Sequence, residues 1–371
     1  MKTRAAVVYE TGKPIEIEEL EVQKPGDGEV LIRYTHAGLC HSDVHVAHGD
    51  LEARLPMVLG HEGAGVIEEV GPGVTRVAPG DHVVCSFIPN CGTCRYCATG
   101  RQSICDMGAT ILEGYLPGEK FPFKGPRGDY GSMCMLGTFS QYGLIHQNSA
   151  IKVDDDLPLD KAVLVGCGVP TGWGSAVNTA EVKAGDVVAV YGVGGIGINA
   201  VQGARHAGAK YVIAVDPLEN KREKAMELGA THAFASADEA QAVIEDITRG
   251  QLADAAILTP DLLTSEIVGA GFQAVGKGGV IVLTGLNKLT EVNVQLPGSV
   301  VTLWRKSIKG SLFGDCNPTV DIPRILSLYQ SGELKLDEII TRTYTLDQVQ
   351  EGYDDLLAGK NVRGVVVHEH S

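Results

Sequence analysis

The sequence predicts an α/β protein in which a mostly-β domain is joined to a domain built on a doubly wound parallel sheet. Two observations indicate this fold class. Residues 1–168 contain short segments rich in strand-forming residues, separated by Gly, Pro and Asp. From residue 169 onward, apolar strand-like segments alternate with helical ones, which is typical of a parallel sheet covered by helices. The 371 residues are enough for two domains with a core each.

The first domain is predicted from three strand segments and a returning tail. Residues 30–34 alternate in period two, and residues 65–70 and 82–87 are short and β-rich. Residues 106–138 are rich in Gly and Pro without a clear period, so we expect a functional or packing excursion there. The tail returns to mixed helix and strand and is expected to pack on the first domain. The predicted domains are 1–168 with 313–371, and 169–312.

A glycine-rich turn in the second domain indicates a dinucleotide site. The turn lies between a strand expected at residues 187–191 and a helix expected at residues 196–207. Such glycines let the backbone approach a pyrophosphate at the N-terminus of a helix. The alternative is a turn that only allows strand and helix to pack tightly. The pattern G-x-G-x-x-G is met by Gly192, Gly194, Gly195, Ile196 and Gly197.

The next strand and helix, expected at residues 211–215 and 219–228, carry the residues that would select the cofactor. Asp216 closes the strand, about twenty residues after the glycines, and its carboxylate would accept hydrogen bonds from the adenosine ribose and repel a 2′-phosphate. We therefore predict NAD rather than NADP. Lys221 and Arg222 could each reach the ribose or phosphate, and the alternative for each is a solvated helix charge. We favour that alternative for Arg222. Strands at residues 255–258 and 279–283 continue the sheet.

Composition excludes several classes of function. The formal net charge is 31 − 46 = −15, which argues against nucleic acid and anionic membranes as partners. No apolar run is long enough to span a bilayer, and the N-terminal residues resemble a strand rather than a signal peptide. Nine cysteines without a secretory signal indicate a reducing, cytoplasmic location in which thiols serve metals or cores.

Four closely spaced cysteines predict a structural zinc site. Three of them are three residues apart, and the fourth follows eight residues later. Four thiolates suit a closed tetrahedral site, which contributes to folding and leaves no position for a substrate. The alternative is a cluster of disulfides, which a reducing compartment disfavours. The four ligands would be Cys91, Cys94, Cys97 and Cys105.

A second set of soft ligands is dispersed along the chain. Cys40, His61 and Cys167 together offer two thiolates and one imidazole, which would leave the fourth position of a zinc ion open. Spacing alone does not join them, and each has a simpler interpretation, such as a core position for Cys167. His41 and His48 have the alternative of a surface position. The other thiols, of Cys85, Cys134 and Cys316, are assigned to cores.

These motifs together resemble the zinc-dependent medium-chain alcohol dehydrogenases over essentially the whole chain. The matching segments begin at Cys40, Gly60, Cys91, Gly137, Val165, Thr171 and Gly192. The resemblance implies a GroES-like catalytic domain and a Rossmann domain, two zinc ions per chain, and oxidation of an alcohol by hydride transfer to NAD. Zinc on Cys40, His61 and Cys167 would lower the pKa of the alcohol. The runs from Ser86 and from Cys167 resemble a narrower branch, the bacterial nicotinoprotein or nitrosodimethylaniline-dependent enzymes.

The resemblance also assigns roles to individual residues. Ser42 would accept the alcohol proton and relay it to His45, which would reach solvent. Glu62 resembles a transient or outer zinc ligand, and Asp43 would orient His61. Three further residues are implied to bind the cofactor: Thr171 at the nicotinamide, and His41 and Arg363 at the pyrophosphate.

Members of the narrower branch hold NAD(H) tightly and pass electrons to an external acceptor such as mycofactocin. Three alternatives remain: an ordinary NAD-dependent zinc alcohol dehydrogenase, a glutathione-dependent formaldehyde dehydrogenase, and a non-catalytic protein that binds zinc and nucleotide. The candidate pocket residues Phe87 and Cys134 favour an apolar primary alcohol. We also expect a homo-oligomer, a dimer or tetramer, in which an apolar edge strand at residues 280–283 pairs across a two-fold axis.

Overall fold

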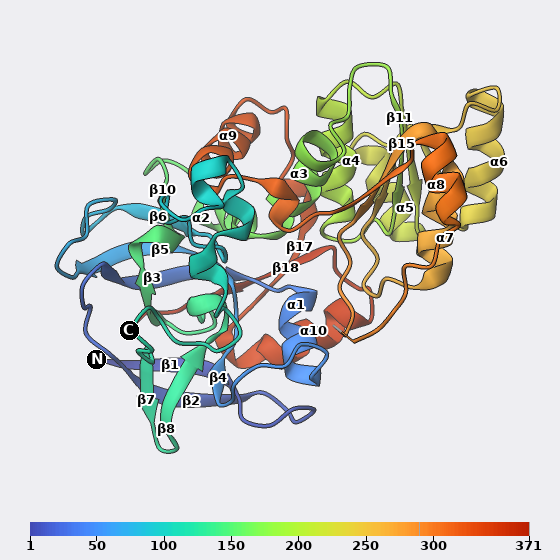
Figure 1. Ribbon diagram of the computed structural model, residues 1–371. Coiled ribbons are helices and arrows are strands. Elements are labelled where there is room, and N and C mark those ends of the chain that lie inside the picture. Colours follow the sequence, from blue (N-terminus) through green and yellow to red (C-terminus); the bar gives the residue numbers. More distant parts are fainter. Residues whose placement is uncertain (289, 371) are drawn as a thin grey trace. The chain divides into compact units, whose positions relative to one another are not determined.

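The computed structural model describes residues 1–288 and 290–370 (Figure 1). The chain divides into two compact units, residues 1–167 with 317–371, and residues 168–316. The boundaries expected from sequence lie after residues 168 and 312, so the second one differs by a few residues. The fold class is confirmed, because both units combine strands and helices in the predicted way.

A small closed barrel forms one end of the first unit. Its strands follow the order β1-β2-β7-β8-β4, and β1 pairs antiparallel with β2. Two of these strands, β7 and β8, form a hairpin inside the stretch 106–138, whose excursion is therefore partly a packing element of the barrel. The strands are β1 (Lys2–Val8), β2 (Glu16–Val22), β4 (Met57–Val58), β7 (Phe123–Gly125) and β8 (Gly128–Ser132).

A seven-stranded sheet lies beside the barrel and carries most of the candidate site. Its order is β10-β6-β5-β3-β18-β17, and β9 pairs with β3. Strand β18 pairs antiparallel with β3, so the tail of the chain is part of the first unit. The strands are β3 (Glu29–Gly38), β5 (Glu62–Val70), β6 (His82–Cys85), β9 (Tyr142–His146), β10 (Ala150–Lys152), β17 (Ile340–Tyr344) and β18 (Arg363–Val367).

The helices of the first unit begin and end where the sequence offers caps. Gly49 ends the first helix in a left-handed conformation, with φ of 83°. Asn317 caps another helix by accepting a hydrogen bond from the Thr319 amide, and Pro318 occupies the first turn. The helices are α1 (His41–His48), α2 (Leu159–Ala162), α9 (Pro318–Gln330) and α10 (Val349–Leu357).

The second unit is a six-stranded sheet in the order β13-β12-β11-β14-β15-β16, and every neighbouring pair is parallel. Residues 280–283 belong to β15, which lies inside the sheet, so the expected edge strand is wrong and β16 is the edge. The strands are β11 (Val187–Tyr191), β12 (Tyr211–Val215), β13 (His232–Phe234), β14 (Ala253–Leu258), β15 (Val275–Leu283) and β16 (Ser307–Gly310).

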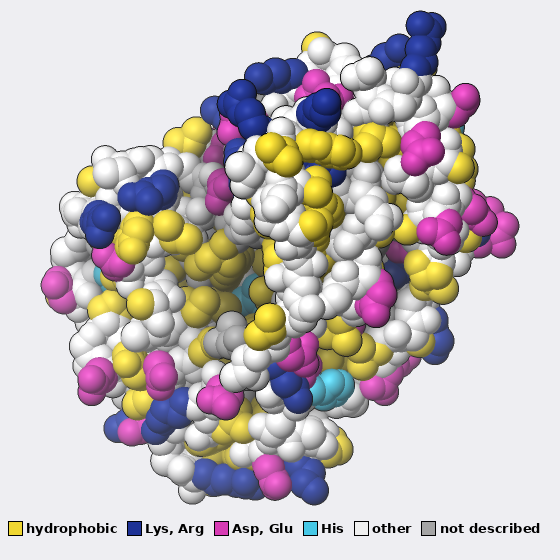
Figure 2. Space-filling model, turned by 45° about the vertical axis from the view of Figure 1, so that its right-hand side comes forward, with side chains coloured by type: hydrophobic (Ala, Val, Ile, Leu, Met, Phe, Trp, Pro, Cys, Tyr) yellow, Lys and Arg dark blue, Asp and Glu magenta, His cyan; other side chains and the backbone are white. Residues whose placement is uncertain are grey.

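Helices flank this sheet, and apolar side chains from both layers form its core. Among the described residues, no helix is long and apolar enough to cross a membrane. The face drawn in Figure 2 shows hydrophobic side chains in patches between charged side chains of both signs. The helices are α3 (Gly168–Gly174), α4 (Gly197–His206), α5 (Glu219–Glu227), α6 (Ala237–Ile247), α7 (Ser265–Ala274) and α8 (Gly298–Trp304).

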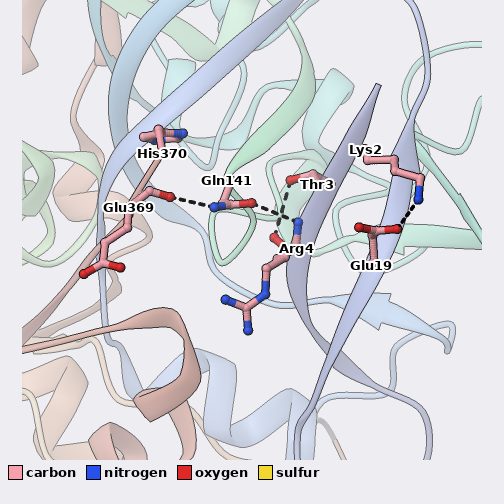
Figure 3. Close-up of a pocket in the computed structure, with 7 residues that line it drawn as sticks. All are labelled: Lys2, Thr3, Arg4, Glu19, Gln141, Glu369 and His370. Atoms are coloured by element: carbon pink, nitrogen blue, oxygen red, sulfur yellow. Dashed lines mark hydrogen bonds and ion pairs between the residues drawn. The ribbon is translucent and has the colours of Figure 1, made fainter.

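A surface pocket lies beside β1 and the end of the chain (Figure 3). The Gln141 side chain bridges its two sides, because it donates to the Glu369 carbonyl at 2.6 Å and accepts from the Arg4 amide at 3.2 Å. Its charges are of both signs, and none of the predicted site residues lines it. The lining residues are Lys2, Thr3, Arg4, Glu19, Gln141, Glu369 and His370.

Candidate functional site

The structure brings together the dispersed ligand set in the first unit. One ligand atom each from Cys40, His61, Glu62 and Cys167 lies within 4.8 Å of the others, and all four residues are buried. Cys40 precedes α1, His61 and Glu62 stand at the start of β5, and Cys167 precedes α3. Sequence positions more than a hundred residues apart therefore meet in one place. Two thiols, an imidazole and a carboxylate are donors that zinc accepts.

The imidazole of His61 is oriented by a carboxylate. His61 Nδ1 lies 3.2 Å from Asp43 Oδ1, and the same oxygen accepts the Gly60 amide at 2.9 Å. His61 Nε2 is buried and has no hydrogen-bond partner among the described residues. A buried nitrogen without a partner is costly unless it binds something. The Asp43–His61 contact fixes the tautomer that leaves Nε2 free for a metal, so the residues present fit a zinc ion.

The charges of this cluster favour thiolate formation. The pKa of Cys40 lies well below its usual range, because the thiol of Cys167 donates to its sulfur and His61 is close, although burial opposes this. Burial lowers the pKa of His61, but the charges of Asp43 and Cys40 outweigh it and raise that pKa well above its usual range. The negative charge of the Cys40 thiolate and the positive charge of the His61 imidazole thus balance each other. A bound metal cation would replace the protons on these ligands.

Glu62 and Arg363 form a buried ion pair beside the cluster. Arg363 Nη2 contacts Glu62 Oε2, and the two side chains are 4% and 0% exposed. Burial raises the pKa of Glu62 to about 7, although the Arg363 guanidinium counteracts it. The other carboxylate oxygen of Glu62 has no partner among the described residues. Arg363, which the resemblance places at a pyrophosphate, therefore also neutralises the carboxylate next to the ligand set.

The two residues predicted to relay the proton lie on one helix. Ser42 and His45 are three residues apart in α1, which places their side chains on the same side of the helix. Ser42 Oγ lies 3.7 Å from the sulfur of Cys40. His45 is only 6% exposed, so the expectation that it reaches solvent directly is wrong. Its Nδ1 lies 3.1 Å from Asp50 Oδ2, and the Asp50 side chain is 28% exposed. Asp50, which the sequence analysis missed, connects His45 to the surface.

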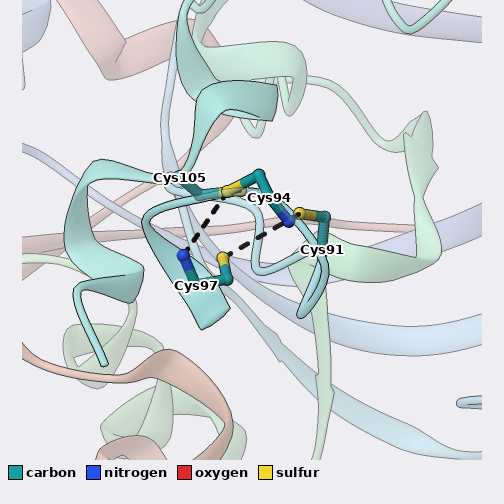
Figure 4. A group of neighbouring side chains, drawn as sticks. All are labelled: Cys91, Cys94, Cys97 and Cys105. Carbon is teal, nitrogen blue, oxygen red and sulfur yellow. Dashed lines mark hydrogen bonds between the residues drawn. The ribbon is translucent and has the colours of Figure 1, made fainter. Parts of the chain in front are cut away.

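The four clustered cysteines also converge (Figure 4). Their sulfur atoms all lie within 4.8 Å of one another, and Cys97 and Cys105 are buried. The amide of Cys94 donates to the Cys91 sulfur at 3.3 Å, and the amide of Cys97 donates to the Cys94 sulfur at 3.4 Å. Burial raises the pKa of Cys91, but hydrogen bonds from the backbone amides of Cys94 and Thr93 outweigh this effect and lower that pKa to about 6. Free cysteines in this geometry fit a four-thiolate zinc site.

The glycine-rich turn lies between β11 and α4, and its glycines have different roles. Gly192 has φ of 84°, which a residue with a side chain rarely adopts. A Cβ on Gly197 would lie 1.9 Å from the Gly192 carbonyl oxygen, so this glycine allows helix and strand to pack. A Cβ on Gly194 would meet only Lys221 Nζ, at 3.8 Å. Gly194 therefore leaves open space above the backbone, which fits the close approach of a pyrophosphate.

Asp216 follows β12 and braces the same turn. Its Oδ2 accepts the Val193 amide at 2.9 Å, and its Oδ1 accepts the Leu218 amide at 2.9 Å. Each carboxylate oxygen retains a lone pair for a ribose hydroxyl. Arg222 Nη1 donates to the carbonyls of Asp216 and Pro217, so it supports the loop rather than being a solvated charge.

The remaining candidates occupy distinct surroundings. Thr171 is buried in α3, whereas His41 is half-buried at the start of α1 and His48 is exposed at its end. The Phe87 ring lies edge-on to the His61 ring, with centroids 5.8 Å apart. Cys134 is buried, and burial raises its pKa to about 12, so its thiol is neutral. The backbone of Cys134 has a φ of 52°, which no sequence pattern indicated.

Known proteins identify the family. Residues 26–155 match the alcohol dehydrogenase GroES-like domain, and residues 195–331 match the zinc-binding dehydrogenase family. The chain is 62% identical to the NDMA-dependent alcohol dehydrogenase of Amycolatopsis methanolica, over 99% of both chains. It belongs to the zinc-dependent medium-chain alcohol dehydrogenases.

Further relatives of this alcohol dehydrogenase widen the comparison. The S-(hydroxymethyl)glutathione dehydrogenase of Paracoccus denitrificans is 35% identical over 99% of this chain and 100% of that one. The crystal structure of benzyl alcohol dehydrogenase from Acinetobacter calcoaceticus has a TM-score of 0.93 and 30% identity, with both chains covered fully. The predicted fold, enzyme class and use of zinc with a nicotinamide cofactor are confirmed at the level of the family.

Proposed function

We propose that this alcohol dehydrogenase oxidises an apolar primary alcohol to the aldehyde, with NAD as a cofactor that stays bound and is reoxidised by an external acceptor. The observation that carries the proposal is the buried set Cys40, His61 and Cys167, in which His61 Nε2 has no partner in the described chain. Similarity to an NDMA-dependent enzyme supports the external acceptor, for which a mycofactocin-like compound is our proposal.

The residues of the first unit support the chemistry in a definite way. Cys40, His61 and Cys167 would hold a zinc ion, which would supply the Lewis acidity that lowers the pKa of an alcohol hydroxyl. Asp43 holds the imidazole of His61 in the ligating tautomer. Ser42 is placed next to Cys40, where its hydroxyl can take the proton that the alcohol loses.

Proton exit is proposed to follow His45 and Asp50. His45 is buried and contacts Asp50, whose carboxylate is partly exposed. A buried base that must return its proton to solvent needs such a connection. The carboxylate of Glu62, neutralised by Arg363, adds no net charge beside the ligands.

The cofactor is proposed to be NAD, and the chain to hold two zinc ions. Asp216 presents a carboxylate where an adenosine ribose would lie, and a 2′-phosphate there would be repelled. The turn from Gly192 to Gly197 would bind the pyrophosphate through its backbone. Gly194 leaves room for the approach, Gly197 allows the turn to pack, and Lys221 lies close to Gly194. The second zinc is proposed for the cysteine cluster that begins at Cys91, where four sulfurs leave no open position.

The substrate is proposed to be apolar. Phe87 packs against His61, and burial keeps the nearby thiol of Cys134 neutral although the charge of His61 lowers its pKa. Both groups favour a hydrocarbon chain or ring over a charged substrate. A relative that is structurally similar over the full chain is named for benzyl alcohol, which agrees with this class.

The chain is proposed to form a homo-oligomer through β16, a strand at the edge of the six-stranded sheet. Strand β16 pairs with β15 on one side, and its side chains include Ile308, which is 37% exposed. The adjacent helix α8 buries none of its residues, and Leu303 on it is 78% exposed. An exposed apolar edge is a site for pairing with a second copy. Sedimentation analysis should give a dimer or tetramer, and Ile308→Lys should shift it toward monomer.

The test of the proposed function uses exhaustively dialysed protein. Primary alcohol plus nitrosodimethylaniline should bleach the acceptor without added NAD, because the cofactor remains bound. Alcohol plus free NAD, without acceptor, should produce little NADH. Cys167→Ala serves as the inactive control. Robust NADH release from dialysed protein would indicate an ordinary alcohol dehydrogenase, and stimulation of formaldehyde oxidation by glutathione would indicate the glutathione-dependent alternative.

A further inference from the structure

A cluster of buried hydroxyl groups lies at the carboxyl ends of β15 and β16. It consists of Ser175, Thr179, Thr284 and Ser311, which are 0%, 1%, 9% and 9% exposed. Thr284 directly follows β15 and Ser311 directly follows β16. Ser175 and Thr179 belong to a π-helical segment that continues α3. We call these four residues the hydroxyl cluster.

The hydroxyl cluster is connected by short contacts. Ser175 Oγ lies 3.0 Å from Ser311 Oγ and 3.2 Å from Thr284 Oγ1, and it reaches the Thr171 carbonyl at 2.7 Å. Thr179 Oγ1 lies 2.8 Å from Ser311 Oγ and 2.9 Å from Asp315 Oδ2. The Ser175 proton goes to the Thr171 carbonyl and the Thr179 proton to Asp315, so the Ser311 hydroxyl donates to one of its two neighbours at a time. The four hydroxyl groups still form one connected network of contacts. Two strand ends and α3 are thereby joined.

The turn that follows Ser311 is strained. Phe313, Gly314 and Asp315 have φ of 56°, 64° and 51°, although only one of the three is glycine. Such conformations are energetically costly for residues with a side chain, and they cluster at ligand clamps. The turn is fixed to α3 and its extension, since Asn178 Nδ2 donates to the Gly314 carbonyl at 3.1 Å. A Cβ on Gly314 would lie 2.2 Å from the Pro170 carbonyl oxygen, which shows how closely the two segments pack.

The position of this cluster in the sheet relates it to the cofactor. In a doubly wound sheet a dinucleotide lies across the carboxyl ends of the strands, one half over each group of three. The glycine turn follows β11 and Asp216 follows β12, so the adenosine half belongs over β11, β12 and β13. The other half, which ends in the nicotinamide, then belongs over β14, β15 and β16. The hydroxyl cluster joins the last two of these strand ends.

We propose that the hydroxyl cluster is a positioning device that holds the nicotinamide half of the cofactor site in its binding conformation and thereby slows cofactor release. The proposal rests on the proposed function, in which NAD(H) stays bound. Thr171, predicted to contact the nicotinamide, is tied to the cluster through its carbonyl. A site that is ordered before binding loses less conformational entropy when the ligand binds, so the ligand dissociates more slowly.

The experiment compares variants that remove single hydroxyl groups. Ser311→Ala removes the residue that contacts both Ser175 and Thr179, and Thr179→Val keeps the shape of the side chain. Thr248→Val is the matched control. The Thr248 hydroxyl donates to the Ile244 carbonyl at 2.6 Å and accepts from the Leu252 amide at 2.9 Å, but it lies between α6 and the amino end of β14, whereas the hydroxyl cluster follows the carboxyl ends of β15 and β16. The probes are NADH and ADP-ribose, which lacks the nicotinamide.

Dissociation rates of both probes are measured by stopped-flow displacement, beside the thermal unfolding of each apo-protein. Ser311→Ala and Thr179→Val should each release NADH roughly fivefold faster or more, the effect of about one buried hydrogen bond. Release of ADP-ribose should be unchanged, and Thr248→Val should affect neither probe. The proposal is overturned if NADH release stays at the wild-type rate, or if both probes accelerate equally. Because each variant is compared with the wild type, this result is independent of whether wild-type NAD(H) survives dialysis.

Discussion

Replacing Gly194 and Gly197 by Ala should separate cofactor binding from folding. At Gly197 the added Cβ would lie 1.9 Å from the Gly192 carbonyl oxygen and 2.6 Å from Thr259 Oγ1. Backbone and helix must then move apart, at a cost of about 3 kcal/mol or more. The higher helix propensity of Ala offsets only about 1 kcal/mol of this cost. For a domain whose unfolding free energy is about 5–15 kcal/mol, Gly197→Ala should be clearly destabilised even without cofactor.

At Gly194 the same substitution meets open space. The added Cβ would have only Lys221 Nζ nearby, at 3.8 Å, and the backbone there needs no left-handed conformation. The free energy of unfolding of the apo-protein should therefore change by less than about 1 kcal/mol, and Gly-to-Ala effects on the unfolded chain favour a small gain. NAD affinity should fall roughly tenfold or more, equivalent to about 1.4 kcal/mol, because the methyl group occupies the approach of the pyrophosphate.

The assay is urea unfolding of both apo-variants, combined with NAD titration by calorimetry. The reasoning predicts opposite profiles: Gly197→Ala loses stability first, whereas Gly194→Ala keeps stability and loses affinity. Wild-type NAD affinity in Gly194→Ala would refute the assignment of this turn to the pyrophosphate. Unchanged stability in Gly197→Ala would refute the packing role that the geometry assigns to it.

Three further predictions address metals, cofactor choice and pH. Cys94→Ala should lower the thermal midpoint and sensitise the protein to chelators, whereas Cys167→Ala should abolish turnover yet retain the fold and one zinc ion by metal analysis. Asp216→Ser should narrow the preference for NAD over NADP in binding titrations; an unchanged ratio would contradict the role of this carboxylate. Burial lowers the pKa of His368 to about 4, from its ordinary value of 6.5. The unfolded chain therefore binds a proton at His368 more readily than the folded chain does. The stabilisation is complete above pH 6.5, and about 3 kcal/mol of unfolding free energy is lost as the pH falls toward 4. Urea titrations of His368→Gln should not show this loss.

Local features of the sequence were sufficient for the second unit. The strand β11, the glycine turn and Asp216 follow one another within thirty residues or so, and their roles depend on neighbours in the chain. The cysteine cluster from Cys91 to Cys105 is equally local, since a zinc ligand spacing is itself a sequence pattern. In both cases the structure depends on interactions between residues that are close in sequence. The sequence pattern is therefore enough to predict them.

Features that depend on distant pairing were not predictable in the same way. The hairpin of β7 and β8 is three and five residues long and Gly-rich, and it exists because β2 and β4 pair with it. Cys40, His61 and Cys167 were joined only through the family resemblance. The burial of His45 and the edge position of β16 depend on tertiary packing, which periodicity over a few residues does not describe. Asp50 was missed because an acidic residue at a helix end is ordinarily solvated.

The two metal groups differ in how much of their geometry the protein supplies without metal. The His61 imidazole is held by its hydrogen bond to the Asp43 carboxylate, and the buried pair of Glu62 with Arg363 joins the side chains of β5 and β18, within a paired sheet. Around Cys91 to Cys105, the described backbone forms only short 3-10 turns, so this segment has little secondary structure of its own to maintain it. Removing a ligand from the first group should therefore leave a preformed but inactive site. Removing a ligand from the second group should unfold the segment from Cys91 to Cys105, because there the metal takes the place of a hydrophobic core.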